Sequence, residues 1–147
     1  MLECKNLTKI YQEKCVVNNL SFNVNRGEVF AFLGSNGAGK TTTIKMILGL
    51  VKKDSGEVIC EEGIKIGYSP ETPSFPPFLT GYEVLEYYAS LQKIPKEKRE
   101  EELEELLETV GLENNKTKVK HYSKGMLQRL ALAQSLLGNP ELLILDE

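Results

Sequence analysis

The stretch GSNGAGKT, Gly34 to Thr41, decides the fold that we expect for this chain. It has the form G-x-x-x-x-G-K-[ST] and follows a compact apolar run from Val29 to Leu33. After it, the segment TTTIKMILGL places apolar side chains on one face of a helix. The expected order is therefore a buried strand, a glycine-rich loop and a helix, and this context distinguishes a phosphate-binding loop from a chance match.

The composition of the loop predicts its ligand. Convergent backbone N–H groups can surround a triphosphate where no Cβ intrudes, which explains Gly34, Gly37 and Gly39. The helix directs the positive end of its dipole at the same anion, while Lys40 is expected to reach the β- and γ-phosphates and Thr41 to coordinate Mg²⁺. A glycine-rich turn that binds nothing would need neither the lysine nor three successive threonines. The sequence thus predicts an ATP and Mg²⁺ site formed by Gly34, Ser35, Asn36, Gly37, Ala38, Gly39, Lys40, Thr41 and Thr42.

The overall composition is that of a single globular domain. The 147 residues are 41% hydrophobic and 27% charged, which argues against wholesale disorder. A net charge of −3 gives no overall electrostatic reason to bind nucleic acid. We find neither a signal-peptide pattern nor a run of about 20 apolar residues, so any membrane association is expected to come through a partner. The three cysteines are widely spaced and lack a CxxC pair, which favours reduced thiols in the cytosol.

The rest of the chain changes character near residues 70 to 80. Strands are expected before this point, including EVIC and IKIGY. Four prolines between residues 70 and 77 interrupt regular structure, and helices follow. Thr80 and Glu83 form a capping-box pattern, Pro95 suits the first turn of a second helix, and a third is expected from about Lys124 to Leu137. The last element, Leu142 to Leu145, is predicted to be a buried strand.

Two carboxylates end the chain at the carboxyl end of that last strand. Ligand sites in open α/β sheets lie at such strand ends. We expect Asp146 to hold Mg²⁺ and Glu147 to polarise the attacking water, since neighbouring side chains on a strand point in opposite directions. An acidic turn after a strand is the alternative interpretation.

The segment YSKGMLQRLALAQSLLGNPELLILDE, Tyr122 to Glu147, resembles the signature motif, following helix and Walker B strand of ATP-binding-cassette (ABC) proteins. The usual signature core is Leu-Ser-Gly-Gly-Gln, of which this chain keeps the serine and the second glycine. The resemblance implies that the signature contacts the γ-phosphate on an opposing subunit, in a head-to-tail dimer around two ATP molecules. A plain helix cap by the serine is the alternative. The implied signature residues are Ser123, Lys124, Gly125 and Met126.

Two further positions match the cassette pattern. Tyr11 lies where the family places an aromatic residue that stacks on adenine, although it could equally be a packing residue. Glu71 lies where the family usually has a glutamine, and it can orient water or bind Mg²⁺ but cannot donate through an amide. The proline-rich segment after it is where cassettes meet the coupling helix of a membrane-spanning subunit.

The resemblance implies an α/β fold of the P-loop NTPase type, with an antiparallel β subdomain and an inserted α-helical subdomain, incomplete at the C-terminus. Residues 1–70 and 140–147 would form the nucleotide-binding core, and about 71–139 the helical subdomain. The family pattern continues past the catalytic glutamate, so we expect a fragment or a truncated product. The implied function is the ATPase subunit of an ABC transporter, acting in the cytoplasm on a transmembrane partner. The forms of the signature and of the IGYSPE loop resemble those of exporters. A soluble cassette protein and a nucleotide-binding module without turnover are the alternatives.

Overall fold

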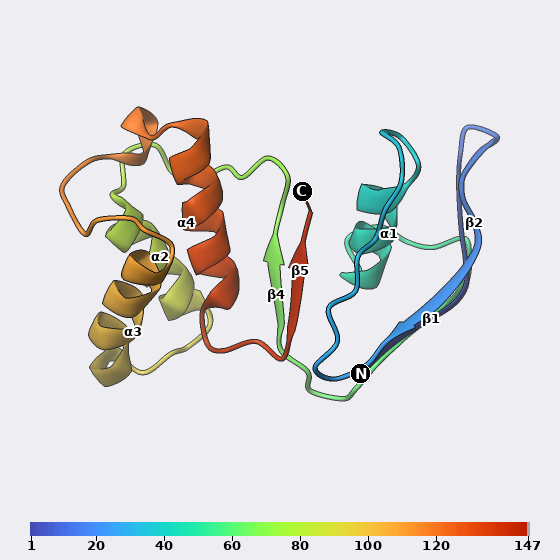
Figure 1. Cartoon of the computed structure of the whole chain (residues 1–147), viewed down its shortest axis with the longest axis horizontal. Coiled ribbons are helices and arrows are strands. Elements are labelled where there is room, and N and C mark those ends of the chain that lie inside the picture. The colour runs from blue at the N-terminus through green and yellow to red at the C-terminus, as the bar shows by residue number, and fades with distance from the viewer. Residues whose placement is uncertain (147) are drawn as a thin grey trace. The chain divides into compact units, whose positions relative to one another are not determined.

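The computed structural model describes residues 1–146, which form two compact units, Met1–Ile64 and a second beginning at Lys65 (Figure 1). Glu147, the expected catalytic base, lies outside the described residues. The contacts group the last strand with the helices, whereas the sequence interpretation grouped residues 140–147 with the amino-terminal part. Each unit is therefore described by itself.

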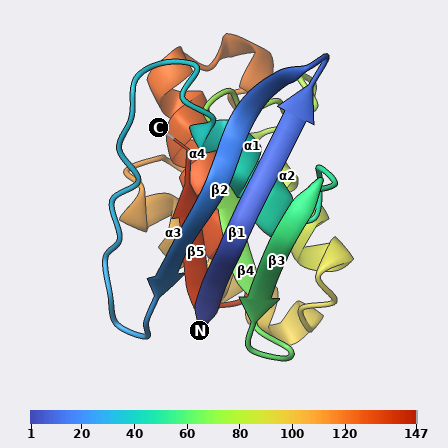
Figure 2. The ribbon, with the colours of Figure 1, turned by 90° about the vertical axis from the view of Figure 1, so that its right-hand side faces the viewer.

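The first unit is an antiparallel sheet with one helix. Its strands are β1 (Leu2–Tyr11), β2 (Lys14–Val24) and β3 (Ser55–Cys60), and β1 lies in the middle (Figure 2). The helix α1 (Lys40–Ile47) follows the glycine-rich loop, as expected from the sequence. The β1–β2 hairpin turns at Gln12 and Glu13, whose φ angles of 46° and 70° are those of a type I′ turn.

A bulge in β1 determines which side chains share a face of the sheet. The register of β1 against both neighbours shifts after Cys4 and Lys5, around Asn6, whose φ is 50°. Before the shift the buried residues are Leu2 and Cys4, and after it Leu7, which is fully buried. An extra residue reverses the alternation of a strand. The bulge thus keeps all three side chains on the inner face.

The segment from Val29 to Leu33 differs from the expectation. It pairs with no strand among residues 1–146, and its ends are open to solvent, with Val29 98% and Leu33 89% exposed. The prediction of a buried strand here is wrong for the described chain. An apolar run becomes a strand only where neighbours satisfy its N–H and C=O groups. This segment contacts β2 through its aromatic rings instead, since the ring centroids of Phe30 and Phe32 lie 5.1 and 5.6 Å from that of Phe22.

The second unit joins two parallel strands to a helical bundle. The strands are β4 (Ile66–Ser69) and β5 (Leu142–Leu145), which confirms two expected strands. The helices are α2 (Gly81–Leu91), α3 (Lys96–Thr109), a 3₁₀ turn (Val119–His121) and α4 (Lys124–Leu136). Gly67 of β4 lies so close to α4 that a Cβ there would collide with the Ser135 carbonyl oxygen.

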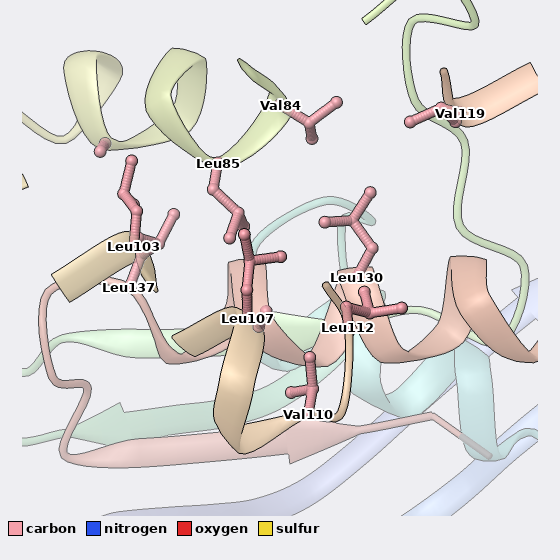
Figure 3. Packing of buried hydrophobic residues seen from close by; sticks show 11 residues of the cluster. Val84, Leu85, Leu103, Leu107, Val110, Leu112, Val119, Leu130 and Leu137 are labelled. Carbon is pink, nitrogen blue, oxygen red and sulfur yellow. The ribbon is translucent and has the colours of Figure 1, made fainter. Parts of the chain in front are cut away.

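The core of this unit lies between α2, α3 and α4 (Figure 3). Leu85 of α2 is directed toward Leu107 of α3, and both are essentially inaccessible to solvent. The capping box that begins α2 is confirmed, because the Glu83 N–H donates to the Thr80 hydroxyl and the Glu83 carboxylate accepts from the Thr80 N–H. The larger buried set is Val84, Leu85, Ala89, Leu103, Leu107, Val110, Leu112, Val119, Leu130, Ala133 and Leu137.

Candidate functional site

The glycine-rich loop has a backbone that requires glycine. Gly37 and Gly39 have φ angles of 81° and 91°, in the left-handed region that side chains with a Cβ rarely adopt. A Cβ on Gly39 would also lie 2.6 Å from the carbonyl oxygen of Val16 and 3.0 Å from Val17 Cγ2. Gly34 has an ordinary φ, but a Cβ there would lie 3.2 Å from that of Ala38. The loop therefore runs close to β2 at Gly39, where a side chain has no room, and packs tightly against its own Ala38 at Gly34.

Hydrogen bonds within the loop bring its polar groups to the start of α1. The Lys40 ammonium donates to the carbonyl oxygens of Gly34 (2.8 Å) and Ser35 (3.3 Å), so the side chain bends back over the loop. The Ala38 N–H donates to Ser35 O at 3.0 Å, and the Thr43 hydroxyl to Gly39 O at 2.9 Å. The remaining predicted residues lie in the loop or in the first turn of α1, namely Asn36, Thr41 and Thr42.

Tyr11 lies at the end of β1, in the same unit as the loop. It is 44% exposed, and the Lys9 ammonium lies 5.0 Å from the centroid of its ring. Its ring is therefore not a core packing element. The remaining exposed surface is available for contact with another flat group.

Asp146 follows β5 directly and is 4% exposed. Its N–H donates to Ser69 O at 2.9 Å, which extends the parallel pairing by one residue. The Tyr68 hydroxyl donates to Asp146 Oδ2 in a long hydrogen bond of 3.5 Å. Burial raises the pKa of Tyr68, and the neighbouring carboxylate raises it further, so Tyr68 remains a neutral donor.

Sequence reasoning did not identify Tyr68 as a site residue. The feature that could have identified it is its place in IGYS, near the carboxyl end of a strand. The sequence did not show that this strand pairs with Leu142–Leu145. Glu71 lies two residues beyond the same strand end, in an exposed bend. Parallel strands end at the same edge of a sheet, so Glu71 and Asp146 both follow that edge.

The signature residues form the first turn of α4. The Ser123 hydroxyl accepts the Met126 N–H at 3.2 Å, so this serine is the N-cap. Met126 is half-buried against the helical core, whereas Lys124 and Gly125 are exposed. The nearest atom to a Cβ on Gly125 would be Ser123 Oγ at 4.0 Å, and its φ is not positive. Neither packing nor backbone conformation within this unit therefore requires glycine at this position.

The expected residues thus form two groups. Tyr11 and the loop belong to the first unit, and Glu71, Asp146 and the signature residues to the second. Residues 1–146 contain no group of three acidic, histidine or cysteine side chains that could hold a metal ion.

Comparisons with known proteins identify this combination of features. Residues 17–147 match the family described as ABC transporter. The chain is 46% identical over 159 residues to the uncharacterized ABC transporter ATP-binding protein YhcH of Bacillus subtilis (strain 168), covering 100% of this chain and 51% of that protein. It is 43% identical over 158 residues to the bacitracin transport ATP-binding protein BcrA of Bacillus licheniformis, with 100% and 51% covered.

A solved structure agrees with these relatives. The dimeric structure of a post-hydrolysis state of the ATP-binding cassette MJ0796 bound to ADP and Pi superimposes with a TM-score of 0.89 at 27% identity, covering 100% of this chain and 74% of that one. The expected P-loop fold is thereby confirmed. The chain spans about half the length of the curated relatives that it matches. None of the helices described in residues 1–146 is long and apolar enough to cross a membrane.

Proposed function

Because this chain belongs to the ABC transporter family, we propose that it forms the ATP-binding part of a transporter's ATPase subunit. The observation that supports ATP binding most directly is the loop Gly34–Gly39. Its left-handed glycines and its approach to β2 leave a turn that exposes backbone N–H groups at the start of α1, where the helix dipole favours an anion. Lys40 already lies across this loop and can exchange its carbonyl partners for phosphate oxygens.

Roles for the remaining residues follow from their chemistry. We propose that Tyr11 stacks on adenine and that Thr41 and Asp146 hold Mg²⁺ together with phosphate oxygens. The ion, when bound, would neutralise charge that develops on the β- and γ-phosphates. Glu147 would accept a proton from the attacking water, and Glu71 would orient that water or contribute to the metal site. Tyr68 would keep the Asp146 carboxylate oriented.

The partners in this proposal are a second cassette and a membrane-spanning subunit. The dimeric assembly of the MJ0796 cassette supports the first, and the names of the relatives support the second. Ser123, Lys124, Gly125 and Met126 would then face the ATP of the opposing cassette, where the small Gly125 leaves room for phosphate. Such a protein would act in the cytoplasm, at the membrane, through its transmembrane partner. Residues 1–70 and 140–147 would form its nucleotide-binding core and about 71–139 its helical subdomain.

The test of ATP binding is calorimetry with Mg-ATP. Replacing Lys40 by alanine removes a charge-assisted contact of roughly 1.5 to 3 kcal/mol, so the affinity should fall about 10- to 150-fold. Lys45→Ala is the matched control, because Lys45 is an exposed lysine on the same helix. Equal affinities of the Lys40→Ala variant and the unchanged chain would refute the proposal.

Hydrolysis is tested separately through its dependence on assembly. A site completed by a second cassette should release phosphate at a rate per molecule that rises with protein concentration. Glu147→Gln should abolish the release, while Glu108→Gln, on the exposed side of α3, should not. A rate per molecule that stays constant with concentration would contradict a dimeric site.

A further inference from the structure

The side chains of Lys9, Tyr11 and Asp54 form a connected group, and only Tyr11 among them had an expected role. The Lys9 ammonium lies 3.2 Å from Asp54 Oδ1 and 5.0 Å from the centroid of the Tyr11 ring. The other oxygen of Asp54 accepts the backbone N–H of Ile10 at 2.7 Å. The Asp54 N–H in turn donates to Thr8 O at 3.0 Å. Asp54, just before β3, is therefore attached to β1 by its backbone and by both carboxylate oxygens.

This group lies on the face of the sheet that also bears the phosphate loop. Lys9 is directly opposite Val17 in the β1–β2 register, and opposed residues of an antiparallel pair point to the same face. Val17 is buried, and its Cγ2 lies against the Cα of Gly39, where a Cβ would approach to 3.0 Å. Lys9 and the phosphate loop thus both lie beside the Val17 side chain, within the first unit.

The lysine is shielded from water more than a surface lysine normally is. Its side chain is only 12% exposed, although that of its partner Asp54 is 42% exposed. The hydrogen bond from the Ile10 N–H, and to a smaller extent the one from the Lys9 ammonium, holds the pKa of Asp54 below its usual range. The Asp54 carboxylate is therefore ionised at neutral pH. Shielding from water strengthens the contact between a cation and an aromatic face.

We propose that Lys9, fixed by Asp54, is a positioning residue for the nucleotide base: it holds the Tyr11 ring from one face so that the base can stack on the other. This inference rests on the proposed ATP binding and extends it to the choice of ligand. A ring that is ordered before binding loses little entropy when the base arrives. The Asp54–Lys9 pair should therefore favour ligands that carry a flat base over ligands that carry phosphates alone.

The experiment compares Mg-ATP with inorganic tripolyphosphate, which has the phosphates but no base, by calorimetry on the 147-residue chain. Lys9→Met keeps the length of the side chain and removes its charge. Removing a cation–π contact at a partly exposed site should lower the affinity for ATP roughly two- to fivefold. Tripolyphosphate should bind unchanged. Lys9→Arg should restore the affinity for ATP, since arginine keeps both the charge and the contact with the ring.

The matched control is Lys5→Met. Lys5 lies on the same strand and pairs with Glu3 at 3.1 Å, so the change in net charge is identical. It should leave both ligands unaffected. In a Tyr11→Leu background, Lys9→Met should no longer weaken ATP binding, because the ring through which it acts is absent.

Several outcomes would overturn the inference. An equal loss for ATP and tripolyphosphate would make Lys9 a phosphate-binding residue, and no loss for either would remove it from the site. If Lys9→Met lowers the melting temperature, Asp54→Asn provides the second variant, since its amide oxygen can still accept the Ile10 N–H while the charge is lost. Failure of the unchanged chain to bind either ligand would instead refute the proposed function, which the Lys40→Ala comparison distinguishes.

Discussion

Replacing Gly39 by alanine should destabilise the first unit more than replacing Gly37, although both glycines have left-handed backbones. The φ angles are 91° and 81°, so the backbone strain is similar, about 1 to 2 kcal/mol for each alanine. A Cβ on Gly37 would meet nothing within 4 Å, whereas on Gly39 it would lie 2.6 Å from Val16 O. Relieving such a collision in a packed site costs about 1 to 3 kcal/mol. We therefore expect a total loss of about 2 to 5 kcal/mol for Gly39→Ala.

The assay is urea unfolding followed by circular dichroism, with the two variants compared at the same protein concentration. The difference between their free energies of unfolding isolates the collision, because the strain of the left-handed backbone is common to both. Calorimetry with Mg-ATP on the folded fraction of each variant then measures the effect on binding. Equal losses of stability in the two variants would refute the argument, since they would mean that β2 moves away from the loop without cost.

Three further expectations concern acid stability, thiol reactivity and the core. The hydrogen bond from the Thr80 N–H, and to a smaller extent the one from Lys118, lowers the pKa of Glu83 below its usual 4.5. The contribution of Glu83 to stability is therefore present above pH 4.5 and is lost as the pH falls below it. In the Glu83→Gln variant, the midpoint of urea unfolding should fall less steeply in acid. Burial raises the pKa of Cys4 to about 11, so iodoacetamide should modify the exposed Cys15 first, and mass spectrometry showing the reverse order would contradict this. Leu85→Ala should lower the free energy of unfolding in urea by about 2 to 5 kcal/mol. Leu91 on the same helix is 61% exposed, so Leu91→Ala should change that free energy by no more than about 0.5 kcal/mol.

Features specified by a few neighbouring residues could be predicted from the sequence. The capping box of Thr80 and Glu83 satisfies its own backbone groups, so the signal and the structure lie within one turn. The cap of α4 by Ser123 is of the same kind. The phosphate loop is also local, because its left-handed positions demand glycine wherever the loop occurs.

Features that depend on distant partners could not be predicted in this way. The apolar composition of Val29 to Leu33 indicated a strand, but strand formation depends on a neighbour that the segment itself does not specify. The contact of Tyr68 with Asp146 required the pairing of strands 78 residues apart in sequence. The link from Asp54 to Tyr11 likewise depends on the register of β1 and β3 and on the bulge at Asn6. These are non-local relations, and composition does not determine them.

The short parallel pair of β4 and β5 has a mechanical consequence. The Ser69 carbonyl accepts the N–H of Asp146, so the first residue after β5 is attached to the last residue of β4. The proline-rich segment that contains Glu71 begins immediately afterwards. A displacement that moves Ser69 and leaves the strand pairing intact should therefore move Asp146 with it. A pull on the carboxyl end of β4 would thus reach a buried acidic group through the backbone hydrogen bond between two neighbouring strand ends.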